Sequence, residues 1–156
     1  MSDITAPTAP TGLRAVFARF TFLHLAWVQA AVAMAGSLYF SEIARYVPCS
    51  LCWYQRIAMY PLVAILGVGI LRRDPKVKWY ALPLSIIGMG ISLFHSAMQY
   101  GLIPATACSA VESTSCTIGW LNWLGFIEIP LLAFVAFAVI TLSLFLYQPA
   151  VAADEA

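Results

Sequence analysis

Residues 48–56 read Pro-Cys-Ser-Leu-Cys-Trp-Tyr-Gln-Arg, so that Cys49 and Cys52 stand directly before an apolar segment that runs from Trp53 to Leu71. A helix that crosses a membrane needs about 20 mostly apolar residues, and this segment supplies them. The Cys-x-x-Cys spacing recurs in thiols that are active in disulfide exchange. The stretch therefore predicts a redox pair at a membrane surface, exchanging electrons with a molecule dissolved in the lipid.

The rest of the chain has the composition of a membrane protein. Of its 156 residues, 62% are hydrophobic and only 10% are charged, and the mean hydropathy is +0.87. A soluble domain of this length needs far less apolar content. Four segments are apolar enough to span a bilayer, at 20–40, 53–71, 79–100 and 123–147. We predict an all-α fold, a four-helix membrane bundle that forms a single domain over residues 1–156.

The first span is expected to be a retained helix, because Arg14 and Arg19 precede an apolar run longer than a signal-peptide core and another span follows almost at once. The sequence has no Gly-rich phosphate loop, no internal repeat and no basic, aromatic-interleaved face. These absences argue against nucleotide or nucleic-acid binding. Within the spans, Ala31 with Ala35 and Gly88 with Gly90 are expected to allow close helix contacts.

The basic residues predict the orientation of the bundle. Six of the eight Lys and Arg residues lie before the first span or between the second and third, namely Arg14, Arg19, Arg72, Arg73, Lys76 and Lys78. Basic residues near membrane spans concentrate on the cytoplasmic side. We therefore expect both termini in the cytoplasm, and the connections at 41–52 and 101–122 on the extracytoplasmic side.

The four cysteines all fall in these two extracytoplasmic connections, where disulfides persist. Four cysteines allow three pairings, of which Cys49 with Cys52 and Cys108 with Cys116 needs the least backbone movement. Cys108 and Cys116 could also form a purely structural staple. A zinc site of four thiolates is another alternative, but the two loops differ in cysteine spacing, so no metal is expected.

Cys52 and Arg56 are expected to act together at the start of the second span. Unpaired N–H groups of the first helical turn favour an anion at Cys52, and Arg56 lies one turn further on. Both effects predict a thiolate at Cys52. An arginine costs about 2.5–3.5 kcal/mol at the centre of a membrane and less near its surface. Besides reaching the lipid headgroups, the guanidinium could donate hydrogen bonds to the carbonyl of a bound quinone.

This ordered set of features resembles the DsbB-type quinone-linked disulfide oxidoreductases, especially the short members of the BdbC kind. The resemblance runs from the first span to about Ile140 and is carried by residues 48–56, 94–100 and 123–130 and by the second cysteine pair. It implies an enzyme of the bacterial cytoplasmic (inner) membrane that reoxidises a DsbA-like thioredoxin-fold partner. The electrons would pass to ubiquinone or menaquinone, and the disulfides would serve secreted proteins.

The resemblance also implies a role for each cysteine. Cys108 corresponds to the cysteine that the partner attacks and Cys116 to its companion, although their short spacing leaves open which of them is attacked. Cys49 and Cys52 correspond to the pair that reoxidises this loop pair. The cysteine at the Cys52 position interacts directly with the quinone in the family, and the arginine at the Arg56 position supports quinone binding.

Three further polar residues lie at the extracytoplasmic ends of spans. His95 and Gln99 share a helical face, and the resemblance implies that His95 meets a quinone carbonyl or relays its proton. Glu128 lies early in the fourth span, and the sequence leaves three roles open for its carboxylate. It could simply contact water, handle protons, or form an ion pair with Arg45 or Arg56.

Two other protein classes fit part of this pattern. Enzymes of the vitamin K epoxide reductase type share the four spans and the quinone chemistry, but they place their quinone-facing Cys-x-x-Cys in the last span, where this chain has none. A non-enzymatic membrane subunit with structural disulfides is the second alternative. A thiol-reducing enzyme would need cysteines near the cytoplasm, and the sequence places none there.

Overall fold

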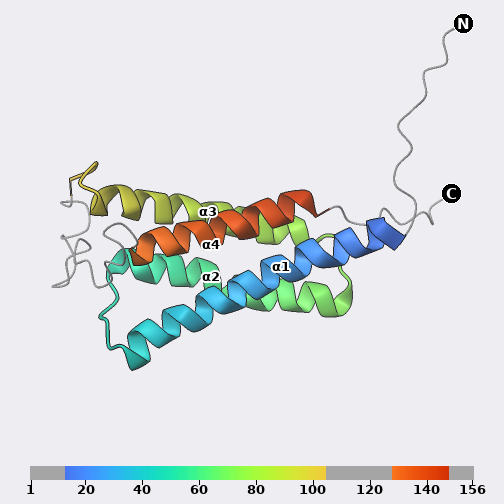
Figure 1. The fold of residues 1–156 in the computed structure, drawn as a ribbon, viewed down its shortest axis with the longest axis horizontal. Coiled ribbons are helices and arrows are strands. Elements are labelled where there is room, and N and C mark those ends of the chain that lie inside the picture. The colour runs from blue at the N-terminus through green and yellow to red at the C-terminus, as the bar shows by residue number, and fades with distance from the viewer. Residues whose placement is uncertain (1–12, 105–127, 148–156) are drawn as a thin grey trace, which may run out of the picture.

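Four long helices make up most of the part of the chain that the computed structural model describes, residues 13–104 and 128–147. In chain order they are α1 (Leu13–Leu38), which continues as the π-helix η1 (Tyr39–Ile43), α2 (Ser50–Arg72), α3 (Val77–Gln99) and α4 (Ile129–Leu146). Figure 1 shows them running lengthwise beside one another with alternating direction. This arrangement brings the starts of α2 and α4 and the end of α3 to one end of the bundle.

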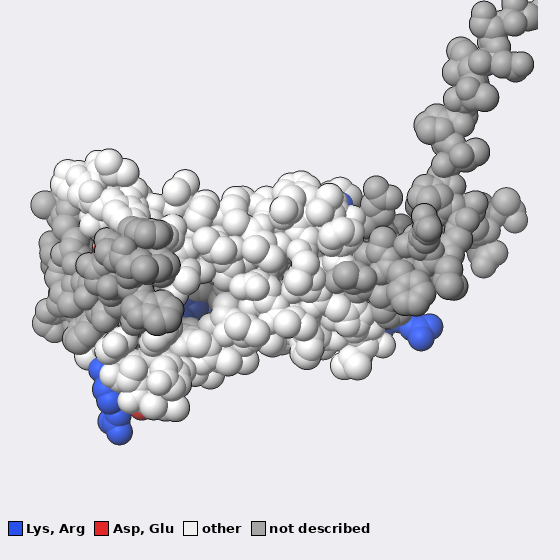
Figure 2. All heavy atoms as spheres, in the orientation of Figure 1, with Lys and Arg blue, Asp and Glu red and all other residues white. Residues whose placement is uncertain are grey.

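All four helices are long and apolar enough to cross a membrane, which confirms the predicted all-α four-span fold. The second and third helices begin earlier than expected, at Ser50 and Val77 rather than at residues 53 and 79. Residues 123–127 of the fourth expected span lie outside the described residues, and α4 itself begins at Ile129. On the face shown in Figure 2, charged atoms gather near the two ends of the bundle, as lipid-facing surfaces require.

A short turn joins α2 to α3. Arg73 caps the end of α2, and its left-handed backbone (φ 52°) lets the N–H of Asp74 bond to the carbonyl of Gly69 at 3.0 Å. The carboxylate of Asp74 then accepts the backbone N–H of Lys76 at 2.8 Å, one residue before α3 begins. The two helices therefore pack as neighbours.

Small residues set how closely the helices approach. Ala26 and Ala30 of α1 are fully buried, whereas Ala31 of the expected pair is half-buried and Ala35 is exposed. Gly88 packs against Phe137 of α4, because a Cβ at Gly88 would lie only 2.2 Å from that ring. An added Cβ at Gly90 meets nothing within 4 Å, so only the first of the two glycines makes a close contact.

Candidate functional site

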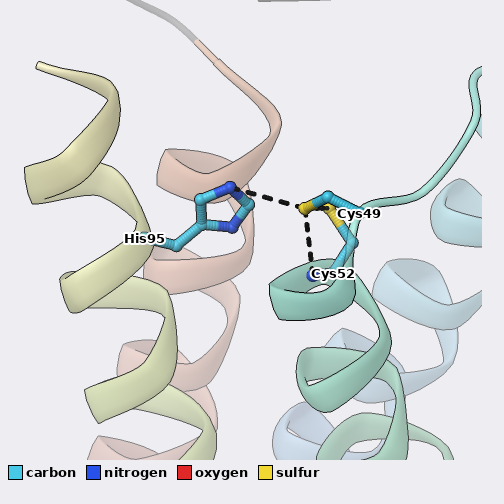
Figure 3. Close-up of side chains that lie close together, drawn as sticks. All are labelled: Cys49, Cys52 and His95. Atoms are coloured by element: carbon cyan, nitrogen blue, oxygen red, sulfur yellow. Dashed lines mark hydrogen bonds between the residues drawn. The ribbon is translucent and has the colours of Figure 1, made fainter. Parts of the chain in front are cut away.

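Cys49 and Cys52 meet at the start of α2 (Figure 3). Cys49 is the N-cap residue of the helix, and its sulfur accepts the backbone N–H of Cys52 at 3.4 Å. The two sulfur atoms are 2.9 Å apart and both thiols are free. A disulfide needs a separation of about 2.05 Å, so a small movement closes or opens the bond. The helix start thus holds the pair ready for exchange.

His95 reaches this pair from α3. Its Nε2 lies 3.8 Å from the sulfur of Cys49, and its side chain is almost fully buried. The amide nitrogen of Gln55 lies 3.3 Å from the other ring nitrogen, Nδ1. When the Gln55 amide donates to Nδ1, a neutral imidazole carries its proton on Nε2, facing the sulfur of Cys49. Cys49, His95 and Gln55 therefore form one buried chain of hydrogen-bonding groups.

The hydrogen bonds in this chain favour a thiolate at Cys49 rather than at Cys52. The thiol of Cys52, then the side chain of His95 and the backbone N–H of Cys52 together lower the pKa of Cys49 to about 4, although burial opposes the shift. The sequence predicts that the free N–H groups of the first turn favour an anion at Cys52. Because the N-cap is Cys49, one of those groups points to its sulfur instead.

An apolar cavity of about 340 Å³ adjoins Cys52. Its walls come from α1, η1, residues 46–48 before α2, α2 itself and α4. Its size lies within the range of about 300–1,000 Å³ that is usual for small-molecule sites. Four of its lining residues are also exposed on the outside of the bundle, namely Val32 of α1, Val47 before α2, and Leu132 and Val135 of α4. In a bilayer the cavity would therefore open sideways to lipid, between α1 and α4.

Arg56 lines the same cavity, one turn of α2 beyond Cys52. Its Nη2 donates to the carbonyl of Ser37 on α1 at 3.1 Å, and its guanidinium lies 5.4 Å from the centre of the Trp53 ring. A guanidinium carries five N–H donors, so the bond to Ser37 leaves others for a ligand. Among the described residues Arg56 forms no ion pair with Glu128, which was one of the possibilities that the sequence left open.

The structure does not bring every expected site residue to the cavity. His95 and Gln99 are absent from its walls, and Gln99 Oε1 is buried with no hydrogen-bond partner among the described residues. Glu128 Oε2 is also buried without a partner in this part of the chain, and desolvation raises the pKa of its carboxyl group. Cys108 and Cys116 lie outside the described residues.

Gln55 is a site residue that the sequence alone does not indicate, although it lies three residues after Cys52. Its side chain is buried, contacts His95 and lines the cavity beside Cys52. One feature of the sequence could have indicated a role for Gln55: its amide lies inside a predicted membrane span, where a polar group needs a hydrogen-bond partner.

A four-span bundle that holds a free dithiol pair next to a buried histidine and a lipid-facing cavity defines the class of membrane-embedded thiol–disulfide oxidoreductases. The family described as "Disulfide bond formation protein DsbB" matches residues 18–147. The chain therefore belongs to the DsbB family. This membership confirms the resemblance found in the sequence and makes the protein a membrane oxidoreductase that generates disulfides.

Two relatives indicate the branch of the family. "Disulfide bond formation protein C" of Bacillus subtilis (strain 168) is 50% identical over 124 residues, which cover 78% of this chain and 88% of the relative. "Probable disulfide formation protein C" of Halalkalibacterium halodurans is 53% identical over 114 residues, which cover 73% and 83%. No solved structure matches the chain at a significant level.

Proposed function

We propose that this protein passes electrons from a reduced DsbA-like thioredoxin-fold partner to a membrane quinone, either ubiquinone or menaquinone. One observation carries the quinone assignment: Cys52 and Arg56 share the wall of an apolar cavity whose rim faces the lipid. A quinone is lipid-soluble and carries carbonyl oxygens that accept hydrogen bonds. The cavity supplies an apolar volume for the ring and a charged donor for an oxygen atom.

Each residue around the Cys49–Cys52 pair has a separate role in the proposed transfer of electrons to quinone. A bound quinone supplies the acceptor for two electrons and two protons. Arg56 holds one of its oxygens by a charge-assisted hydrogen bond and favours negative charge there. Cys52 is the electron-donating sulfur, because it lines the cavity. Forming the S–S bond between Cys49 and Cys52 breaks both S–H bonds, and the two electrons and two protons released would pass to that acceptor beside Cys52, while His95 stabilises the thiolate of Cys49.

Cys108 and Cys116 are proposed to collect electrons from the soluble partner. Support comes from the burial of Cys49, which is only 5% exposed and so is closed to a folded protein. In the net reaction the partner's dithiol becomes a disulfide and the quinone becomes a hydroquinone, so electrons and protons balance. The loop pair is first reduced by the partner and then reoxidised by the Cys49–Cys52 disulfide.

The proposed location is the bacterial cytoplasmic membrane, with both termini in the cytoplasm and the cysteines outside. The Cys49–Cys52 pair starts α2, whereas Arg72 and Arg73 stand at the opposite end of that helix. This separation agrees with the positive-inside rule if Arg72 and Arg73 face the cytoplasm. The whole chain is proposed to act as one membrane domain.

The test is turnover by the purified protein in detergent. A reduced DsbA-like protein is mixed with a short-chain ubiquinone or menaquinone analogue, and quinone reduction is followed by absorbance. Wild type and Ser50→Ala, a matched change inside the Cys-x-x-Cys stretch, should both turn over, and Cys52→Ser should not. Turnover by Cys52→Ser, or none by wild type with a competent partner, would contradict the proposal. The ratio of kcat/KM for the two analogues identifies the preferred quinone.

A further inference from the structure

The side chains of Cys49, Cys52 and His95 form a set of potential metal ligands. Their two sulfur atoms and a ring nitrogen of His95 all lie within 4.8 Å of one another. In a tetrahedral zinc site, Zn–S bonds of about 2.3 Å and Zn–N bonds of about 2.0–2.1 Å put neighbouring ligand atoms roughly 3.3–3.8 Å apart. The observed 3.8 Å between Cys49 Sγ and His95 Nε2 matches this spacing, and the sulfurs at 2.9 Å would need to separate slightly.

The chemistry of these three ligands selects a particular kind of ion. Two thiolates and one imidazole suit Zn²⁺ and disfavour Mg²⁺ and Ca²⁺, which take oxygen ligands. With a metal bound at Nε2 of His95, the other ring nitrogen, Nδ1, is not coordinated, and Gln55 already contacts it. If the amide turns to present its oxygen, it can accept the Nδ1 proton, an arrangement typical of metal-bound histidines.

The fourth coordination position has room as well. Cys52 lines the apolar cavity, so a water molecule bound to an ion at Cys52 could occupy the cavity edge. Sites with three protein ligands and one open position are common for zinc. Cys49 and His95 are buried, which shields the remaining ligands from competing water.

We propose that the reduced Cys49–Cys52–His95 cluster is a zinc site, and that Zn²⁺ bound there blocks the enzyme. Binding exchanges the remaining thiol protons for the ion, and no electron moves. Closing the Cys49–Cys52 disulfide removes two of the three ligands, so zinc binding and disulfide formation exclude each other. This site differs from the four-thiolate zinc site considered in the sequence analysis. Its ligands are Cys49, Cys52 and His95, and it does not use Cys108 or Cys116. The binding claim stands independently of the proposed function, and only the inhibition rests on it.

Cobalt(II) tests the binding claim, because thiolate-bound Co²⁺ absorbs strongly in the near ultraviolet. The protein is purified in detergent without quinone, reduced with a phosphine and titrated with Co²⁺, and Zn²⁺ is then added to displace it. We expect one Co²⁺ per chain, displaced by Zn²⁺, with at least tenfold weaker binding in His95→Gln and none in Cys49→Ser. The matched control Cys108→Ser/Cys116→Ser should bind as wild type does. Full binding by Cys49→Ser, or loss in the loop variant, would overturn the site.

The oxidised wild type provides a test without any substitution, so it does not depend on a variant that folds. The protein with its Cys49–Cys52 disulfide closed, verified by mass spectrometry, should show no thiolate-to-cobalt band. A band of equal strength in the oxidised protein would overturn the site.

Inhibition is tested in the quinone-reduction assay. Zn²⁺ at concentrations that fill the cobalt-defined site should reduce turnover at least tenfold, and a chelator should restore it. Undiminished turnover with the site filled would overturn the inhibitory role. A protein that never turns over, with or without zinc, would instead contradict the proposed function and leave the cobalt result standing.

Discussion

Nε2 of His95 lies 3.8 Å from the sulfur of Cys49, although 46 residues separate the two in the chain. The contact joins the start of α2 to the end of α3, so it depends on how these helices pack. A Cys-x-x-Cys motif alone supplies two sulfurs and a helix N-terminus. The bundle adds a buried imidazole, which favours the thiolate form of Cys49 and completes the set of three metal ligands.

The reactivity of Cys49 should be nearly independent of pH in the neutral range. Its pKa is lowered to about 4, chiefly by the hydrogen bond from Cys52. A depressed pKa means that the thiolate is populated at every pH above that value and is lost only in more acidic solution. An ordinary thiol, with a pKa of about 8.5, would instead react about tenfold faster for each pH unit up to that value.

The measurement is the rate of iodoacetamide labelling of Cys49 in reduced, chelator-treated protein between pH 5 and pH 9, read by peptide mass spectrometry. A flat profile is expected for wild type. His95→Gln removes a group that lowers the pKa of Cys49, so its labelling at the acidic end should slow. A wild-type rate that climbs steadily to pH 9 would contradict the assigned thiolate.

Arg56→Gln should weaken the use of quinone. The substitution removes a charge-assisted hydrogen bond, typically about 1.5–3 kcal/mol, which corresponds to roughly a 10- to 150-fold change. Quinone kcat/KM should fall by about that factor, while the loop cysteines still react with the reduced partner. Arg45→Gln is the matched control, because it removes an equal charge from an exposed side chain at the same end of the bundle. Equal effects of the two variants would remove Arg56 from the quinone site.

Gln55→Leu should lower kcat by about 10-fold, because the amide no longer holds Nδ1 of His95 and the ring loses its fixed tautomer. Gln55→Glu keeps a hydrogen-bonding group beside Nδ1 and should recover part of the rate. Since Gln55 also lines the cavity, the labelling rate of Cys49 without quinone separates the two roles. Unchanged labelling in Gln55→Leu would show that its effect arises in the cavity and that it does not position His95.

Gly88→Ala should destabilise the bundle. The new methyl group would lie 2.2 Å from the ring of Phe137, which is fully buried and has little room to move. Overpacking of this kind costs about 1–3 kcal/mol. Thermal unfolding in detergent, followed by circular dichroism, should show a lower Tm for Gly88→Ala than for wild type. Gly90→Ala, where the methyl group enters open space, should retain the wild-type Tm, and a matching loss there would refute the contact.

Much of the site was visible in the sequence because its chemistry is local. Cys49, Cys52 and Arg56 lie within two helical turns, and the apolar segments that follow them determine the spans. Gln55 was missed, since only its contact with His95 distinguishes it from any other polar residue near a helix start. The sequence predicts a thiolate at Cys52, whereas the hydrogen bonds of the structure favour one at Cys49, because Cys49 is the residue that caps α2.

The sequence by itself determined the class of fold, the cysteine motif and the family, because membrane spans and short motifs consist of residues that are neighbours in the chain. The tertiary structure alone decided which faces meet: Ala30 rather than Ala35 is buried, and His95 contacts the cysteine pair instead of the cavity. Helices in lipid are apolar on all sides, so hydrophobic periodicity does not mark the packed face. Close steric fit and a few buried hydrogen bonds mark it, and both appear only once the helices are assembled.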